Sequence, residues 1–588
     1  MPVTLTEDLL DLTLGGVEFV PFRLDGPPSP CHPLPQLRRR GDSMPRSFRS
    51  VVLENPFLRL TLLPDLGGRI IRIEDKRTGR DILPWPPKLD LHDGSHRGLW
   101  LKDGIRFLVG ETKQPARDLD LSAVEYQIRQ PQDDDEPGMV ILYELLPGGS
   151  ASWQGGITLY PDRAEFLIEF SLLNRSKGLL PIDTGLAIGF SGDLWSGEDG
   201  SLKIAGPTGE GYWVMPEPSF GHNESSDAGL VVRPRPEESP LLPREVFSWS
   251  LRFAPYSGLG EIKNLSRSAG LGEKDGHLVI QSASRHLDAE LKLETSEGSF
   301  AARADLHPET LFSADLSKIP PVQTIQLPNG TDLSWKGSDC AGGEVGSVNA
   351  STTRPTNLFH ESPEGEFCKA WVYESEDLPF PASPSFIPAW RLARAQAFAR
   401  KDNWIEADRE IDQALILNGE DYAAWWLKSV IRRKMGVGDR PELLNAHYLA
   451  PLEPLLRAEG YLQQGGSHEK QASPVTLRLA KNPDLGLECI DALLEIGLVQ
   501  ESAMLMDEIL RHEDIGLVRL MLAWSLLTLS RMEVEAAQHI SLFEKAALAP
   551  PLPSRWREVE AVKALAARFP QSQKLNEMAQ LAFIRGLR

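Results

Sequence analysis

The segment from His92 to Lys113 contains the side-chain types that proton transfer on a sugar requires. Hydrolysis or epimerisation needs an acid and a base that face one oxygen, and carboxylates about 5 Å or 6.5–9.5 Å apart serve this purpose. Aromatic faces pack against the C–H side of a sugar, and planar polar groups pair with its hydroxyls. We expect Asp103 and Glu111 to transfer protons. The accompanying sugar-binding candidates are His96, Trp100, Lys102 and Arg106.

The same segment also has a purely structural interpretation. If residues 100–102 and 105–109 are strands about an Asp103-Gly104 turn, Asp103 sits at a hairpin tip and Glu111 at a strand end. Asp-Gly is a common hairpin turn, and charged side chains at such tips are often solvated surface. Both interpretations remain open from the sequence.

A second cluster follows an aromatic stretch in the middle of the chain. His222 and Glu224 come shortly after Trp213, and Trp195 precedes all three. A histidine titrates near neutral pH, so His222 beside Glu224 could form an acid–base pair. We expect His222 to be catalytic, and Arg69, Trp195, Trp213 and Glu224 to bind the sugar. The alternative is an exposed loop with an Asx-type turn.

The elements that must position these residues are predicted to be strands. From about residue 50 to 260 many short apolar runs with period-2 alternation are separated by turn signals, and no helical period lies between them. This spacing favours an antiparallel sandwich over a βαβ fold. The expected strands are 51–54, 57–63, 70–74, 123–129, 139–146, 152–160, 164–174, 186–190, 229–233 and 246–253.

The flanking segments suggest three further parts. Residues 1–48 carry one strand-like piece and a Pro-rich run, which indicate a wrapping arm or linker. After the sandwich at 49–265, a shorter β pattern at 266–336 predicts either extra strands or a small appended sandwich. It has expected strands at 277–282, 289–295, 299–306 and 324–327. Residues 337–385 read as a linker with one strand, Lys369–Tyr373.

From residue 386 to 588 the apolar period becomes helical. Small residues where helices cross, such as Ala395, Ala407 and Ala414, fit a paired-helix repeat of roughly 34 residues. A shift by one repeat reaches Trp425, which fits, and then Pro441, which does not. Later helix pairs are expected at 486–497 with 500–512, 516–530 with 533–547, and 555–568 with 573–585. A non-repetitive helical domain is the alternative.

Length and composition limit the number of domains and the classes of ligand. With 588 residues the chain is too long for one core, so several domains are expected. A formal net charge of −21 argues against a nucleic-acid or anionic-membrane binder, because phosphate binding requires clustered Lys and Arg.

Cofactor, metal and membrane signals are weak or lacking in the sequence. The four cysteines, Cys31, Cys340, Cys368 and Cys489, are far apart and show no metal or disulfide spacing, so we expect no cofactor and no metal. The first residues carry acids where a signal peptide needs bases, and no run of 18 apolar residues occurs. A cytoplasmic protein is therefore expected.

Several short stretches of the sequence resemble a known family. The stretches Asn55–Leu60, Pro64–Ile70, Asp75–Asp81 and Ile157–Arg175 resemble a bacterial galactose-mutarotase-like domain of unknown function that is followed by tetratricopeptide repeats. The resemblance implies a β-supersandwich with a concave, sugar-sized groove, a small β appendage and a C-terminal helical repeat domain. It departs at Asp103–Gly110, where Arg106 stands in place of a glutamate of the family's pattern.

Two functions follow as hypotheses. The first is a glycoside hydrolase or sugar isomerase that works by acid–base chemistry in the groove. The second is a non-catalytic carbohydrate-binding scaffold, whose helical repeats bind a protein partner. A homodimer is plausible in either case. A third arrangement, in which the helical domain closes over the groove and supplies part of the site, also stays open.

Overall fold

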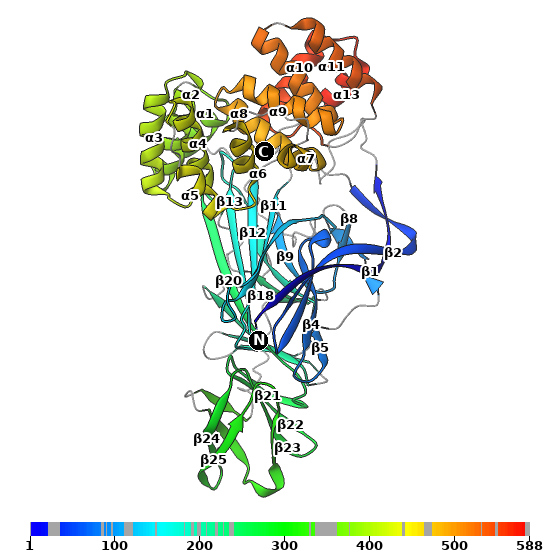
Figure 1. Ribbon diagram of the computed structural model, residues 1–588, viewed down its shortest axis with the longest axis vertical. Coiled ribbons are helices and arrows are strands. Elements are labelled where there is room, and N and C mark those ends of the chain that lie inside the picture. Colours follow the sequence, from blue (N-terminus) through cyan, green and yellow to red (C-terminus); the bar gives the residue numbers. More distant parts are fainter. Residues whose placement is uncertain are drawn as a thin grey trace.

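The molecule is elongated, with a block of helices at one end, a β-sandwich in the middle and a small β region at the other end (Figure 1). Its computed structural model describes residues 2–20, 36–83, 88–89, 91–95, 98–110, 121–146, 150–181, 183–189, 193–196, 201–206, 209–217, 222–226, 229–233, 240–327, 331–335, 362–375, 377–437, 441–463, 473–530, 532–546 and 551–582.

The first sheet of the sandwich has ten strands. They are β1 (Thr4–Val20), β2 (Gln36–Glu54), β3 (Leu58–Leu63), β4 (Arg69–Asp75), β5 (Arg80–Leu83), β6 (Lys88–Leu89), β9 (Ile105–Gly110), β14 (Asp183–Ile188), β18 (His222–Ser226) and β19 (Gly229–Arg233). Their order is β18-β19-β14-β9-β4-β3-β2-β1-β6, with β5 beside β4. The pairs are antiparallel except that β6 runs parallel to β1.

The second sheet has eight strands and is antiparallel throughout. They are β10 (Glu125–Arg129), β11 (Gly138–Leu145), β12 (Ala151–Leu159), β13 (Phe166–Asn174), β15 (Asp193–Ser196), β16 (Leu202–Ala205), β17 (Gly211–Glu217) and β20 (Val246–Tyr256). Their order is β10-β11-β12-β13-β20-β17-β16-β15. The antiparallel sandwich expected from the sequence is thereby confirmed.

The sandwich core lies between the two sheets and is rich in aromatic rings. Phe107 of the first sheet contacts Trp153 of the second, with ring centroids 5.2 Å apart, and Trp153 stacks on Phe170 at 5.7 Å. These side chains alternate along their strands with residues on the outer face, because side chains of a strand point to opposite faces. Packing of the inner face therefore fixes which residues face outward.

The N-terminal segment belongs to the first sheet. Residues 4–20 and 36–54 pair along their whole length as β1 and β2, so the described part of the expected arm forms strands rather than a linker. Leu12 and Phe48 pack with Leu99 of a separate two-stranded sheet made by β7 (Leu91–Ser95) and β8 (Gly98–Leu101). The Pro-rich run 27–30 lies outside the described residues.

The small β region is a separate sandwich of two four-stranded sheets. One sheet holds β21 (Glu261–Leu265), β22 (Ala269–Lys274), β23 (His277–Ser282) and β26 (Phe312–Asp315), in that order. The other holds β25 (Gly298–Leu306), β24 (His286–Thr295), β27 (Val322–Gln326) and β28 (Asp332–Ser334), in that order. It has its own apolar core, which includes Leu278, Leu291 and Ile325. Of the two sequence alternatives, the appended sandwich is the one found.

The C-terminal part is a block of thirteen helices in the described residues. They are α1 (Pro363–Val372), α2 (Ile387–Arg400), α3 (Trp404–Leu417), α4 (Tyr422–Lys434), α5 (Pro441–Leu449), α6 (Pro454–Gln463), α7 (Pro474–Lys481), α8 (Pro483–Glu495), α9 (Val499–His512), α10 (Gly516–Ser530), α11 (Glu533–Lys545), α12 (Trp556–Arg568) and α13 (Gln573–Leu581). Each later helix pair expected from the sequence is present. Pro441, which did not fit the repeat, is the first residue of α5.

The strand expected at Lys369–Tyr373 is wrong, because this segment lies in and just after α1. Ser362 caps the helix by accepting a hydrogen bond from the Gly365 N–H at 3.1 Å, and a proline follows the cap. Phe367 and Trp371, one helical turn apart, are buried, and Trp371 Nε1 donates to Gln396 of α2 at 2.8 Å. Burial against the other helices thus decides the helical state.

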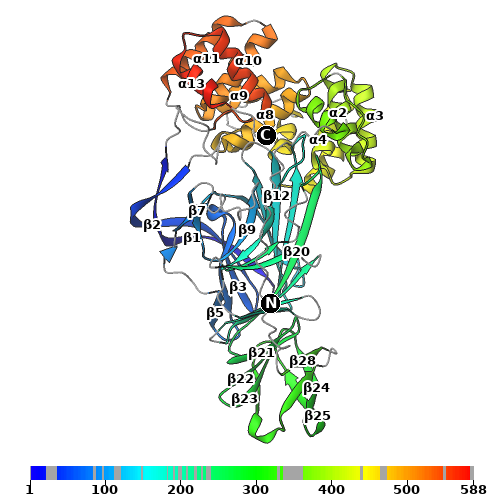
Figure 2. The same ribbon diagram turned by 180° about the vertical axis from the view of Figure 1, so that it is seen from behind.

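The helices sit on one end of the second sheet, as both views show (Figures 1 and 2). Ile141, Tyr143 and Leu173 of the sheet belong to the same apolar cluster as the helices. Buried ion pairs cross the boundary: Arg175 Nη1 lies 2.8 Å from Glu453, and Arg175 Nη2 lies 2.6 Å from Glu488. Apolar and charged contacts together attach the helices to the sheet.

Candidate functional site

A trough of about 510 Å³ lies on the outer face of the second sheet, across β11, β12, β13 and β20. Side chains that alternate with the core residues Trp153, Phe170 and Trp249 form its surface. The lining residues are Ile141, Gln154, Gly155, Gly156, Glu169, Phe170, Ser171, Ser248, Trp249 and Ser250.

Strand register brings the polar lining residues into two neighbouring rows. Gly156, Glu169 and Ser250 are direct cross-strand neighbours in one row. Gln154, Ser171 and Ser248 are direct neighbours in the next row. Because both rows belong to the same face, one amide, one carboxylate and three hydroxyls converge on one shallow depression.

Small residues give this face its hollow. A Cβ on Gly156 would meet only the Glu169 side chain, at an ordinary 3.6 Å. A Cβ on Gly155 would lie 2.9 Å from Cζ of Phe107, so the packed rings beneath the sheet require glycine at that position. With serines at 171, 248 and 250, a ligand can approach the backbone of the sheet closely.

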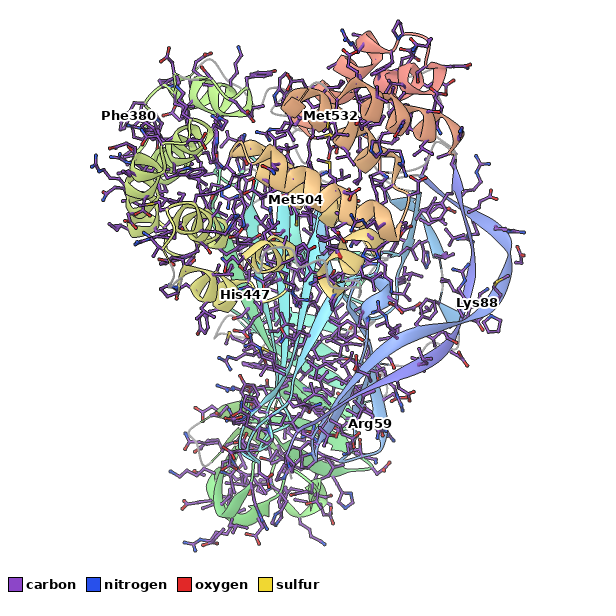
Figure 3. The ribbon with its side chains drawn as sticks, turned by 45° about the horizontal axis from the view of Figure 1, so that its top comes forward. Arg59, Lys88, Phe380, His447, Met504 and Met532 are labelled. Atoms are coloured by element: carbon purple, nitrogen blue, oxygen red, sulfur yellow. The ribbon has the colours of Figure 1, made fainter. Side chains whose placement is uncertain are left out.

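The helical block overhangs one end of the trough. Gln154 Nε2 donates to the carbonyl of Leu449, the last residue of α5, at 3.1 Å. In the neighbouring position Ser152 Oγ lies 2.6 Å from Tyr422 Oη of α4. Figure 3 shows His447 of α5 at the border of the helical block that faces the sheet. Both domains therefore shape this region.

Glu169 is the one charged side chain among the described residues that line the trough. Glu169 is exposed, and none of the described lining residues is basic. At the covered end, Tyr143 donates to Glu453 at 2.7 Å; burial and the nearby Glu453 raise the pKa of Tyr143 well above its ordinary value. The tyrosine is therefore a hydrogen-bond donor at neutral pH, and the trough as a whole is neutral to acidic.

Among the residues singled out from the sequence, Arg69 and Asp103 do meet. Arg69 is fully buried; its Nε donates to the carbonyl of Leu66 at 3.0 Å and its Nη1 to the carbonyl of Asp103 at 2.8 Å. Gly104 follows with φ +89°, and a Cβ there would lie 2.6 Å from the carbonyl oxygen of Ile70. The described contacts of Arg69 thus hold a tight crossing of two chain segments.

Trp100 and Arg106 also lie together. The Arg106 guanidinium carbon is 4.5 Å from the centre of the Trp100 ring, and Arg106 donates to the carbonyl of Leu101. Arg106 is 1% exposed and Trp100 is 6% exposed, while Lys102 is half-buried. The pair is part of the packing on the outer face of the first sheet.

The expected hairpin about Asp103-Gly104 is wrong, although both strands exist. β8 pairs with β7, and β9 pairs with β14 and β4. The turn therefore connects two different sheets, and Asp103 is not at a hairpin tip. Tertiary pairing, which local turn chemistry does not encode, decides this outcome.

Strand register relates part of the second cluster to Arg106. Arg106 is opposite Ala187, Ala187 is opposite Val231, and Val231 is opposite Glu224. His222 lies two positions before Glu224 on β18. β18 is three strands from β9, which is roughly 14 Å at ordinary strand spacing.

The other candidates are dispersed. Trp213 is 3% exposed and packs with Tyr256 and Leu259 where the sandwich joins the small β region. Trp195 lies on β15, opposite Lys203 in register. Glu111 and His96 lie outside the described residues. No sequence-predicted site residue is among the described residues that line the trough.

A second hollow, of about 420 Å³, lies between α2 and residues 377–379. Trp390, Arg394 and Phe398 of α2 line it, and the Arg394 guanidinium carbon lies 4.7 Å from the Trp390 ring centre. Arg394 also pairs with Glu410 of α3 at 3.0 Å, so its charge is compensated.

The described part of the chain can be searched for metal sites, disulfides and membrane-spanning helices. No group of three or more His, Cys, Asp or Glu side chains there is arranged to hold a metal ion. Cys368 and Cys489 are buried free thiols. None of the described helices combines the length and the apolar character needed to cross a membrane.

Sequence reasoning missed the residues of the trough. Five trough residues lie inside predicted strands but were not singled out as site candidates: Gln154, Glu169, Ser171, Ser248 and Ser250. A usable signal existed in the repeated pattern of small or polar residues opposite large aromatics in SWQGG, EFS and FSWS. An outer face with so many small residues on adjacent strands is hollow.

Comparison with known proteins gives matches along the chain. Residues 38–173 match a family model described as Domain of unknown function (DUF5107). A TPR-domain containing protein from Parabacteroides distasonis is similar over 97% of this chain and 96% of its own, with 12% identity and a TM-score of 0.35.

Two further solved structures are similar to a shorter part of the chain. A galactose mutarotase-like protein from Clostridium acetobutylicum covers 36% of this chain and 96% of its own, with 10% identity and a TM-score of 0.26. A putative aldose 1-epimerase from Escherichia coli K12 covers 35% of this chain and 98% of its own, with 15% identity and a TM-score of 0.24. The solved structures similar to this chain thus include mutarotase-like, epimerase and TPR proteins, and residues 38–173 match a domain whose function is unknown.

Proposed function

We propose that this protein binds a neutral carbohydrate in the trough on the outer face of the second sheet. The observation that carries the proposal is the convergence of Gln154, Glu169, Ser171, Ser248 and Ser250 around one hollow. Amide, carboxylate and hydroxyl groups together supply both donors and acceptors, and a sugar hydroxyl needs both.

The size of the trough fits a small ligand. Its volume of about 510 Å³ falls within the roughly 300–1,000 Å³ of ordinary ligand sites. Small residues at 156, 171 and 248 leave room for a ring to lie on the sheet. The shallow form favours a ligand that keeps one side exposed, as a sugar residue within a longer chain does.

Charge discriminates between ligand classes. A phosphate or carboxylate ligand requires basic side chains or a helix N-terminus for its negative charge. The described lining offers neither, and Glu169 would repel an anion. A neutral polyhydroxylated ligand meets no such penalty, and Glu169 can accept two of its hydroxyl protons in hydrogen bonds.

A hydrolase is the second candidate, and one observation favours it. Glu217 of β17 is opposite Ser250, and Ser250 is opposite Glu169, so both glutamates belong to one cross-strand row. Two strand spacings separate their Cα atoms by roughly 10 Å. Carboxyl groups about 5 Å or 6.5–9.5 Å apart act as the catalytic pair of glycosidases. Asp103, Glu111 and His222, the residues expected from the sequence, are an alternative acid–base set.

Calorimetric titration with free sugars and with α- and β-glycosides tests the binding proposal. Native protein is expected to bind at least one neutral sugar, and Glu169→Gln and Gln154→Ala are expected to weaken binding at least tenfold. Glu290→Gln, an exposed glutamate of the small β region, is the matched control and should bind like the native protein. Binding that Glu169→Gln and Gln154→Ala leave unchanged would exclude the trough as its site.

Turnover of the same panel tests the hydrolase candidate. Hydrolysis that Glu169→Gln and Glu217→Gln each abolish would support the pair in the trough. Hydrolysis or anomer exchange that only Asp103→Asn, Glu111→Gln or His222→Asn abolishes would instead support the alternative set. Binding without turnover would leave the carbohydrate-binding scaffold as the function.

For the helical block we propose a protein-binding role. Ile405 and Ile416 of α3 and Tyr448 of α5 are 67%, 74% and 86% exposed. Contiguous exposed apolar patches mark surfaces that bind other proteins, and we propose that these three side chains belong to such a patch. Pull-down with this block, with Ile416→Glu as the comparison, tests this second role.

A further inference from the structure

Two long strands of this protein each have an open side, and they differ in the residues that oppose pairing with a further strand. β2 pairs with β3 only over Val51–Glu54, so its preceding residues pair with β1 on one side and with no described strand on the other. β25 is the outermost strand of its sheet, with β24 as its described neighbour. Open backbone groups on such strands are a template for pairing with another chain.

The open side of β2 carries the usual protections. Arg38, Arg39, Arg40 and Arg46 are exposed along it, and Pro45 removes a backbone donor. The pairing with β1 is also interrupted by a bulge between Gly15 and Gly16. Charges, proline and a bulge on an edge strand all oppose pairing with a further strand.

β25 is less protected, although a bulge between His286 and Ala289 interrupts its pairing with β24 near one end. Its nine residues, GSFAARADL, contain one arginine, one aspartate and no proline. Its pairing with β24 is regular from Ala304 to Gly298. Phe300 is opposite Leu293, which is buried in the core of the small sandwich, yet Phe300 is 44% exposed. A core-facing aromatic ring is thus left uncovered at an edge that is free to pair.

We propose that β25 pairs in antiparallel fashion with β25 of a second copy of this chain, about a two-fold axis at Ala302. This register pairs all nine residues of the strand. Phe300 then lies opposite Ala304 of the second copy and is covered by it. Ala301 lies opposite Arg303 of the second copy. The proposal is independent of the carbohydrate proposal.

Charge and size favour this register. With the axis at Ala302, no two like charges face each other, and the alanines at the centre allow close approach. With the axis at Arg303, two arginines would be directly opposite, which is unfavourable. The small β region lies at the end of the molecule away from the helices, so the pairing leaves the trough and the helical block accessible (Figure 1).

A matched pair of substitutions at Ala301 tests the proposal in the full-length chain. Ala301 is exposed, and each substitution acts twice because of the two-fold symmetry. Ala301→Glu places a carboxylate opposite Arg303 of the second copy, and Ala301→Lys places a like charge there. Cross-strand charge pairs contribute about 0.2–1 kcal/mol each, so Ala301→Glu should lower the dimer Kd roughly 2- to 30-fold and Ala301→Lys should raise it.

Sedimentation velocity over a range of protein concentrations gives these Kd values. A dimer that Ala301→Glu tightens and Ala301→Lys weakens supports the proposal. A chain that stays monomeric even as Ala301→Glu, or a dimer with the same Kd in both variants, would overturn it. Ser43→Glu and Ser43→Lys on the protected edge of β2 are the controls and should change nothing. Lys292 is opposite Ala301 within the chain, so thermal unfolding of each variant checks that the small sandwich is intact.

Discussion

Arg175 is predicted to be the side chain on which the attachment of the helices to the sandwich depends most strongly. Its Nη1 donates to Tyr422 Oη and to Glu453, both at 2.8 Å, and its Nη2 donates to Glu488 at 2.6 Å. The Glu453 side chain is 0% exposed and that of Arg175 is 3% exposed. Substitution by Met keeps much of the volume and removes the charge.

The expected cost follows from the burial of the partners. Removing one member of a buried ion pair leaves the other charge uncompensated and costs about 3–5 kcal/mol. Glu453 retains the hydrogen bond from Tyr143, and Glu488 retains Arg555 at 3.2 Å, so each carboxylate keeps one partner. We therefore expect Arg175→Met to lower the free energy of unfolding by about 3 kcal/mol, the lower end of that range.

Urea unfolding and limited proteolysis measure this effect. Arg175→Met should unfold at lower urea and be cleaved faster than the native protein. Arg511→Met is the matched control: Arg511 pairs with Asp507 on the surface, with side chains 55% and 53% exposed, and such pairs contribute about 0–1 kcal/mol. In the double variant with Glu453→Gln the loss should be smaller than the sum of the two single losses, because the buried charge is removed as well. A loss below about 1 kcal/mol for Arg175→Met would refute the reasoning.

Three further predictions follow from individual residues. Burial would raise the pKa of Glu488, but Arg175 and Arg555 outweigh it and hold this pKa below the ordinary 4.5. The stability that this carboxylate contributes is therefore present above pH 4.5 and is lost as the pH falls through the lowered pKa. Urea unfolding from about pH 7 to 3 should show a smaller loss of stability in acid for Glu488→Gln than for the native protein. Gly104→Ala should destabilise the sandwich by at least about 1–2 kcal/mol, because alanine disfavours positive φ and its Cβ would strike the Ile70 carbonyl; an unchanged melting temperature would contradict this. Phe300→Ser should lower the binding of a hydrophobic dye and raise the dimer Kd, whereas an unchanged Kd would argue against pairing through β25.

Much of the fold was predictable because it follows from the local periodicity of apolar residues. Alternation of apolar and polar residues located strands such as β12 and β13, and the change to a helical period located the helix pairs from α8 to α13. The strand expected at Lys369–Tyr373 failed because a short apolar run fits either state, and packing of Trp371 against α2 decides it. The expected hairpin of residues 100–102 with 105–109 failed for the related reason that tertiary contacts set strand partners, and β8 pairs with β7 instead.

The candidate site was much harder to predict. Local composition drew attention to Arg69, Trp100 and Arg106, but their described contacts include backbone carbonyls, one another and, for Trp100, the ring of His92. The trough draws on β11, β12, β13 and β20, and its lining residues are up to 109 positions apart, from Ile141 to Ser250. Register between these strands, and not spacing along the chain, brings Gln154, Glu169 and Ser250 together.

One measurement tests the carbohydrate proposal most directly. Gly156 lines the trough, and a Cβ there makes only an ordinary contact, so Gly156→Phe fills the hollow from an exposed face. Calorimetric titration of the native protein with the neutral sugar that binds best should show saturable binding, and Gly156→Phe should abolish it while the thermal unfolding curve stays close to that of the native protein. Equal binding by a folded Gly156→Phe variant would contradict the account.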